Sequence, residues 1–60
     1  MARKYERYEV ASNIQGEEGT FFSYREALSL YLHVKGYGGD TKATLYGVDD
    51  SGEYTVIMSF

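Results

Sequence analysis

The stretch Phe22-Ser-Tyr-Arg-Glu-Ala-Leu-Ser-Leu-Tyr-Leu-His-Val-Lys-Gly36 decides the fold, because both ends of a helix are marked in it. Ser23 and Glu26 form a capping box, in which each side chain satisfies a backbone N–H at the other residue. Lys35 falls in the last turn, where it complements the helix dipole, and Gly36 can supply a left-handed cap. We therefore predict a helix over residues 24–35.

The predicted helix is amphipathic. When its residues are placed around the helix axis, the apolar stripe contains Ala27, Tyr31, Tyr24, Leu28 and Val34, and the polar stripe contains Arg25, Ser29, His33 and Glu26. Leu30 and Leu32 flank the apolar stripe, one on each side. They make the apolar surface wider than packing on a single sheet face requires.

Strands are predicted on both sides of the helix. Residues 4–14 have a strand pattern because Tyr8, Val10 and Ile14 recur on one face. Glycines and charges predict a turn after that strand, and residues 20–22 form either a short returning strand or the approach to the helix. Residues 41–48 and 53–60 form a predicted hairpin. The fold class is therefore α+β, a single domain over residues 1–60 with one helix on a small antiparallel sheet, in the order β-(β)-α-β-β.

The hairpin register has two solutions. If Gly52 takes the left-handed position of a bulged turn, Val48 faces Tyr54, Tyr46 faces Val56 and Thr44 faces Met58. A four-residue loop would instead pair Leu45 with Val56. The sequence leaves both open, and a slip of one residue exchanges the two faces.

Either register leaves apolar groups on both faces of the hairpin. We expect Tyr54, Val56, Met58 and Phe60 to point one way and Ile57 the other. One helix can cover only one of these faces. Scattered exposed apolar residues are ordinary on a protein surface, but a small domain usually needs additional stabilisation. We therefore favour a second face that is covered in a homodimer or in a complex.

Composition narrows the class of protein. The chain has 60 residues, no cysteine and one histidine, so disulfides and the common zinc sites are not expected. It contains no apolar run of about 20 residues, the length of a membrane span, and no apolar segment behind its charged N-terminus that would indicate a secretory signal. The expected location is cytoplasmic, with no membrane partner.

Charge argues against direct nucleic-acid binding. The formal net charge is −3, and the acidic residues gather in two loops, whereas the basic residues are scattered. Proteins that bind DNA or RNA usually have a basic face that contacts phosphates. A basic protein partner remains compatible with this charge pattern.

No catalytic apparatus is recognisable. His33 is the only conventional base near neutral pH, and it lies beside Ser29 on the polar helix stripe, without a pocket or an oxyanion donor. Asp49, Asp50 and Glu53 are close in sequence but lack calcium-loop spacing, so they are interpreted as a solvated turn. We expect no enzyme activity, no metal and no cofactor.

Seven tyrosines in 60 residues are the most unusual feature of the composition. Tyrosine is enriched at protein interfaces, where it adds contact area and a hydroxyl group. We expect Tyr8, Tyr24, Tyr31 and Tyr54 to be core residues. The predicted partner-binding residues are Tyr5, Leu30, Leu32, Tyr37, Tyr46, Glu17, Glu18, Asp49 and Asp50.

The segment Phe22-Ser-Tyr-Arg-Glu-Ala-Leu28, followed by Leu45-Tyr46 and a closing hairpin that ends in Phe60, resembles small phage-encoded proteins that inhibit host defence or repair enzymes. In size, acidity, aromatic content and lack of cysteine, the chain is similar to the dimeric uracil-DNA glycosylase inhibitors of some Bacillus phages. The resemblance spans most of the chain in plan, without a diagnostic motif, and carries over no functional residue. It implies an inhibitor that acts by binding.

Three functions follow as hypotheses. The first is a non-enzymatic module, expected to be a homodimer, that occludes or sequesters a protein partner; its acidic loops would steer it to a basic surface. A special case is an acidic DNA mimic, in which Glu17, Glu18, Asp49, Asp50 and Glu53 imitate phosphates. The alternative from another class is a sponge for a nucleotide or other small ligand, with its site at a subunit interface. A scaffold without a partner is the third.

Overall fold

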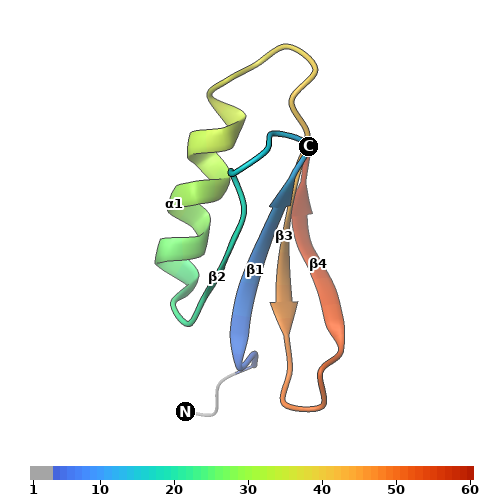
Figure 1. The fold of residues 1–60 in the computed structure, drawn as a ribbon. Coiled ribbons are helices and arrows are strands. Elements are labelled where there is room, and N and C mark those ends of the chain that lie inside the picture. The colour runs from blue at the N-terminus through green and yellow to red at the C-terminus, as the bar shows by residue number, and fades with distance from the viewer. Residues whose placement is uncertain (1–3) are drawn as a thin grey trace.

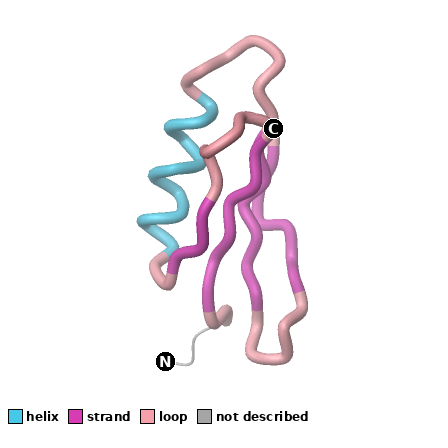
Figure 2. The backbone as a smooth tube through the Cα atoms, in the orientation of Figure 1, coloured by secondary structure: helices cyan, strands magenta, loops and turns pink. Residues whose placement is uncertain are grey.

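The computed structural model describes residues 4–60, and these form one helix and four strands (Figures 1 and 2). In chain order the elements are β1 (Arg7–Ser12), β2 (Gly19–Phe21), α1 (Tyr24–Lys35), β3 (Ala43–Val48) and β4 (Tyr54–Ser59). The short strand before the helix is therefore present. No helix among residues 4–60 has the length and apolar character needed to cross a membrane.

The four strands form one antiparallel sheet in the order β2-β1-β3-β4. This confirms the predicted α+β fold. β1 lies inside the sheet because it pairs with β2 on one side and with β3 on the other, so Tyr8 lies between Phe21 and Gly47. The strands β2 and β4 are the two edges of the sheet (Figure 1).

Helix α1 has the predicted bounds. Ser23 is the N-cap in an extended conformation, and its Oγ accepts a hydrogen bond of 3.5 Å from the Glu26 N–H. The predicted left-handed cap at Gly36 is wrong: Gly36 has a right-handed φ of −67°, and its N–H donates to the carbonyls of both Leu32 and His33. This shared bond continues the right-handed turn, so the chain turns left-handed only at Gly38, where φ is +71°.

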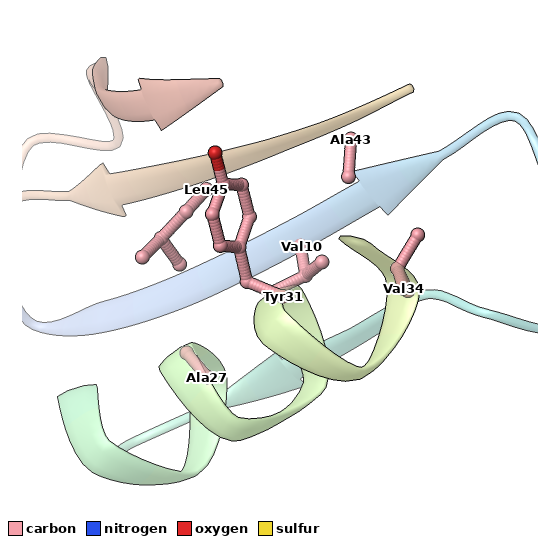
Figure 3. Close-up of a cluster of buried hydrophobic side chains, with 6 residues drawn as sticks. All are labelled: Val10, Ala27, Tyr31, Val34, Ala43 and Leu45. Carbon is pink, nitrogen blue, oxygen red and sulfur yellow. The ribbon is translucent and has the colours of Figure 1, made fainter. Parts of the chain in front are cut away.

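The core lies between the helix and one face of the sheet. Its buried cluster consists of Val10, Ala27, Tyr31, Val34, Ala43 and Leu45 (Figure 3). The helix contacts β1, β2 and β3 but not β4. The predicted apolar stripe is confirmed for Ala27, Tyr31 and Val34, whereas Tyr24, expected in the core, is 40% exposed because it lies in the first turn at the margin of the sheet.

The hairpin begins in the first of the two predicted registers. Val48 pairs with Tyr54, Tyr46 pairs with Val56, and Gly52 has a left-handed φ of +88°. A β-bulge then shifts the pairing, so that Thr44 faces Ser59 and the predicted pairing of Thr44 with Met58 is wrong.

The extra residue at the bulge is Ile57, which changes the phase of the rest of β4. The side chains of Ile57, Met58 and Phe60 pack together against the core, and the Phe60 ring meets Tyr31 edge-to-face at 5.3 Å. The expectation that Met58 and Phe60 share a face with Tyr54 and Val56 is therefore wrong. A bulge lets consecutive residues point to the same side, and here it directs the end of β4 towards the core.

Candidate functional site

The sheet face opposite the helix carries an aromatic and aliphatic cluster, called here the open-face cluster, which consists of the half-buried Tyr46 and the exposed Tyr54 and Val56. Tyr46 lies on β3, on the opposite face from the buried Leu45. Tyr54 and Val56 lie on β4 before the bulge and are 53% and 57% exposed. The expectation that Tyr54 is a core residue is wrong, because no element of residues 4–60 packs over this face.

The two tyrosine rings of the cluster are held in place. They meet edge-to-face with their centroids 5.6 Å apart. The Tyr54 hydroxyl donates a hydrogen bond of 2.9 Å to Glu9 Oε2, which also accepts one of 3.1 Å from Arg7 Nε. The pKa of Arg7 is raised, chiefly by its hydrogen bond to Glu9 and secondly by the neighbouring Tyr54 hydroxyl. The cluster therefore presents pre-oriented aromatic surface, which loses little side-chain entropy when a partner binds.

Tyr5 has a structural position on the other face of the sheet. Its ring lies over Gly47, where a Cβ atom would come within 2.6 Å of Tyr5 Cγ. It also meets Tyr8 edge-to-face at 5.9 Å, and Tyr8 meets Tyr24 at 5.5 Å. These contacts make Tyr5 the end of a packed aromatic row. Tyr5 and Tyr46, both predicted contact residues, thus lie on opposite faces.

Tyr37 lies just beyond the helix and is 55% exposed. Its hydroxyl lies 3.4 Å from His33 Nε2, which in turn lies 3.5 Å from Glu17 Oε2. This chain of polar contacts joins the β1–β2 loop to the end of the helix. Ser12 Oγ reinforces the loop by donating a 2.6 Å hydrogen bond to the Glu17 carbonyl. The Ser12 hydrogen bond holds the loop in place, whereas Glu17 Oε2 is buried without a hydrogen-bond partner among residues 4–60. The neighbouring Glu18 remains exposed.

The two leucines that flank the helix stripe have different surroundings. Leu30 is half-buried and packs against the core near Gly19, at the β2 side of the helix. Leu32 is 52% exposed. It belongs to the opposite flank, which also carries Lys35, whose ammonium lies over the Phe60 ring at 6.0 Å. Only Leu32 of this pair offers apolar surface outside the core.

The two acidic loops lie at opposite ends of the sheet. The loop with Glu17 and Glu18 follows β1, whereas the loop with Asp49 and Asp50 follows β3, which runs antiparallel to β1 (Figure 1). The structure does not bring the predicted acidic residues together. Because residues 4–60 are elongated, with extents of 38 × 18 × 18 Å, these loops form two separate negative ends.

Asp49 organises the hairpin turn. Its carboxylate accepts hydrogen bonds from the Ser51 hydroxyl at 2.6 Å, from the Ser51 N–H at 2.9 Å and from the Glu53 N–H at 3.0 Å. The Ser51 hydroxyl, followed by the Glu53 N–H, lowers the pKa of Asp49. These bonds engage the carboxylate within the turn, so Asp50 is the freer of the two predicted acidic contacts.

Two small hollows lie away from the open-face cluster. One of about 270 Å³ lies between the end of β1 and the start of β3, and one of about 110 Å³ lies beside Tyr5 and Asp50. Across residues 4–60, no group of three or more His, Asp or Glu side chains is placed to hold a metal ion. The exposed open-face cluster is therefore the best-defined candidate surface for binding.

Comparison with known proteins adds no relationship: no family model, no curated protein sequence and no solved structure matches this chain.

Sequence reasoning missed Tyr54 and Val56 as members of the candidate site. The strand pattern before the bulge places them opposite Val48 and Tyr46, and this pairing was one of the two predicted. Tyr46 was a predicted contact residue, so its cross-strand neighbours on the same face could have been included with it. The sequence had no signal for the bulge that separates them from Met58 and Phe60.

Proposed function

We propose that this protein acts without catalysis, by binding another protein through the open-face cluster and occluding the surface it covers. The single observation that carries the proposal is the exposure of Tyr54 and Val56 beside Tyr46, on a sheet face that no element of residues 4–60 covers. Tyrosine is one of the residue types enriched among those that contribute most to the binding energy of protein interfaces.

Charge supports a partner with a basic surface. The net charge is −3, and Asp50 and Glu18 are exposed at the two ends of the molecule, where they favour approach to positive surfaces. The resemblance to small acidic phage inhibitors makes host defence and repair proteins the first partners to test. The two acidic loops lie at opposite ends of the molecule. This arrangement supports the DNA-mimic hypothesis less well than a continuous row of acidic residues, which would imitate successive phosphates.

The test compares two exposed tyrosines. Tyr54→Ser removes the ring at the centre of the cluster, and Tyr24→Ser removes a ring on the helix side, 40% exposed against 53% for Tyr54. Proteins captured from the native cell by the wild-type chain are identified, and the affinity of each for the purified variants is measured by calorimetry. Loss of an interfacial tyrosine should weaken binding about tenfold to a hundredfold.

Three outcomes distinguish the possibilities. The expected result is strong weakening by Tyr54→Ser and little change with Tyr24→Ser. Equal affinities for both variants and the wild type would overturn the proposal. If affinity instead falls steeply with salt and is insensitive to Tyr54→Ser, the acidic ends carry the binding and the mimic hypothesis replaces it.

A further inference from the structure

The outer edge of β4 is open and has little protection against pairing. Natural proteins block such edges with charges, prolines, bulges, very short strands or a covering helix. Tyr54–Ser59 contains no charged residue and no proline, and helix α1 does not reach it. Its remaining protection is the bulge at Ile57, midway along the strand, where the tube bends (Figure 2).

The hydrogen bonds of the hairpin show which main-chain groups face outwards. The Asp49 N–H donates to the Glu53 carbonyl and the Phe60 N–H donates to the Ala43 carbonyl, both at 3.1 Å. Because bonded and non-bonded pairs alternate along an antiparallel ladder, Tyr54, Val56 and Ser59 direct their N–H and C=O groups away from β3. These groups are available to another strand.

The two ends of this edge carry opposite charges. Strand alternation from Tyr54 on the open face assigns the exposed Glu53 to the helix side of the sheet. Lys35 lies over Phe60 at the other end of β4, also on the helix side. Neither side chain is in an ion pair within residues 4–60. If β4 pairs antiparallel with β4 of a second copy, each Glu53 comes close to Lys35 of the other copy. The two-fold symmetry then produces two Glu53–Lys35 ion pairs.

We propose that β4 pairs antiparallel with β4 of a second copy, about a two-fold axis through Val56, to form one continuous sheet from two chains. In this register the outward groups of Val56 pair with those of its copy, and Glu53 lies opposite Ser59 of the other copy. Beyond the Val56 pair the bulge puts the two strands out of phase, because Tyr54, whose main-chain groups face outwards, lies opposite Met58 of the other copy, whose groups face β3. The main-chain ladder is therefore confined to the Val56 pair. The interface is therefore completed by the two Glu53–Lys35 pairs and by the half-buried Met58 and Phe60.

This inference is independent of the proposed function. It uses the main chain at the sheet edge and charges on the helix side, whereas the protein partner would contact tyrosine rings on the open face. Pairing of two copies would bring the two Val56 side chains together and leave the rings of Tyr46 and Tyr54 uncovered, with the rings of both copies on one surface. A protein that fails one test can therefore still pass the other.

A cysteine at the axis gives the first test. The chain has no cysteine, so Val56→Cys introduces the only thiol, about 5.5 Å in Cα distance from its copy in this register. That separation allows a disulfide. The matched control is Thr20→Cys, an exposed position on the other edge strand, β2. We expect mild oxidation to cross-link Val56→Cys chains at least about tenfold faster than Thr20→Cys chains.

Charge reversal gives the second test, read as solution mass by sedimentation across a concentration series. Glu53→Lys or Lys35→Glu alone replaces two attractions by two repulsions and should weaken the dimer about tenfold. The double variant should regain most of the affinity, and circular dichroism checks that each variant is folded. A wild-type mass of one chain at every concentration, equal cross-linking of the two cysteine variants, or no rescue by the double variant would each overturn the proposal.

Discussion

The two edges of the sheet are built differently. Strand β2 has three residues, lies next to helix α1 and contributes Phe21 to the core. Strand β4 has six residues, lies beyond the helix and keeps Tyr54 and Val56 more than half exposed. An edge can thus be protected by its shortness and by a helix, or it can remain accessible to a partner.

The comparison also shows how little apolar surface a domain of this size can cover. The helix is wide enough for three strands, so the fourth depends on side chains that reach the core from its far end. Ile57, Met58 and Phe60 provide this connection because the bulge turns them inwards. One half of β4 packs against the core, and the side chains of Tyr54 and Val56 in the other half remain exposed.

The largest expected effect contrasts the two edges directly. Phe21→Ala removes a ring packed on the core from β2, and it should lower the free energy of unfolding by about 2–4 kcal/mol. Val56→Ala shortens an exposed side chain on β4, and its cost should stay within about 1 kcal/mol. Urea denaturation of both variants measures the difference. Equal losses would show that the two edges contribute alike.

A second prediction concerns Gly47, which links the two halves of the sheet by pairing with Tyr8 and Thr55. Gly47→Ala places a Cβ within 2.6 Å of Tyr5 Cγ, so the ring must move. The expected loss is about 1–3 kcal/mol of stability, as for other overpacked sites. Thermal unfolding should show that adding Tyr5→Ala to this variant relieves the clash, although the packing of the ring is lost. A Gly47→Ala variant as stable as the wild type would contradict the close contact.

A third prediction concerns the bulge in β4, which deletion of Ile57 should remove. Leu45 already pairs with Met58 and Tyr46 with Val56, so removal of the residue between Val56 and Met58 leaves a regular ladder in the same register. The monomer should lose about 1–2 kcal/mol of apolar burial. The straightened edge should also associate more strongly, because bulges discourage edge pairing.

Sedimentation and urea denaturation check both parts of this prediction, with Ile57→Ala as the control that keeps the bulge. Unchanged association of the deletion variant would show that the bulge does not limit pairing at this edge.

The smallest effect concerns acid stability at the hairpin turn. The Ser51 and Glu53 donors lower the pKa of Asp49 in the folded state. The ionised carboxylate therefore stabilises the fold at a pH above the pKa that Asp49 has in the unfolded chain. That contribution disappears as the pH falls below about 4. Urea midpoints of wild type and Asp49→Asn should differ near neutral pH and converge in acid. If the urea midpoints still differ at about pH 2, where Asp49 is protonated, the effect of Asp49→Asn does not come from loss of the charge.

Local signals were sufficient to predict the helix. Its start depends on Ser23 and Glu26, which are neighbours in sequence, and both predicted bounds are confirmed. Local signals were not sufficient to predict the faces of the hairpin. In Tyr54-Thr-Val-Ile-Met-Ser-Phe60, either set of alternate side chains could face the core. The phase is decided by Phe60 meeting Tyr31, a contact between residues far apart in the chain.

The sequence also contains a signal for the position of Tyr5, one of the predicted contact residues. A glycine inside a strand often marks close approach of another group, and Gly47 stands in the middle of β3. That position could have suggested a ring packed over it, and hence a structural role for Tyr5. The identity of the ring could not be read from the sequence, because six other tyrosines were available.

The loop at Gly38 and Gly39 divides the chain into two contiguous halves. The first contains β1, β2 and α1, the second contains β3 and β4, and they meet along the β1–β3 ladder and the core around Leu45. Each half forms its own hairpin but leaves its apolar surface uncovered when alone. A chain cut in this loop would therefore behave as a split protein, whose fragments fold only by complementing each other. Fused to separate proteins, the two fragments could report when those proteins come together.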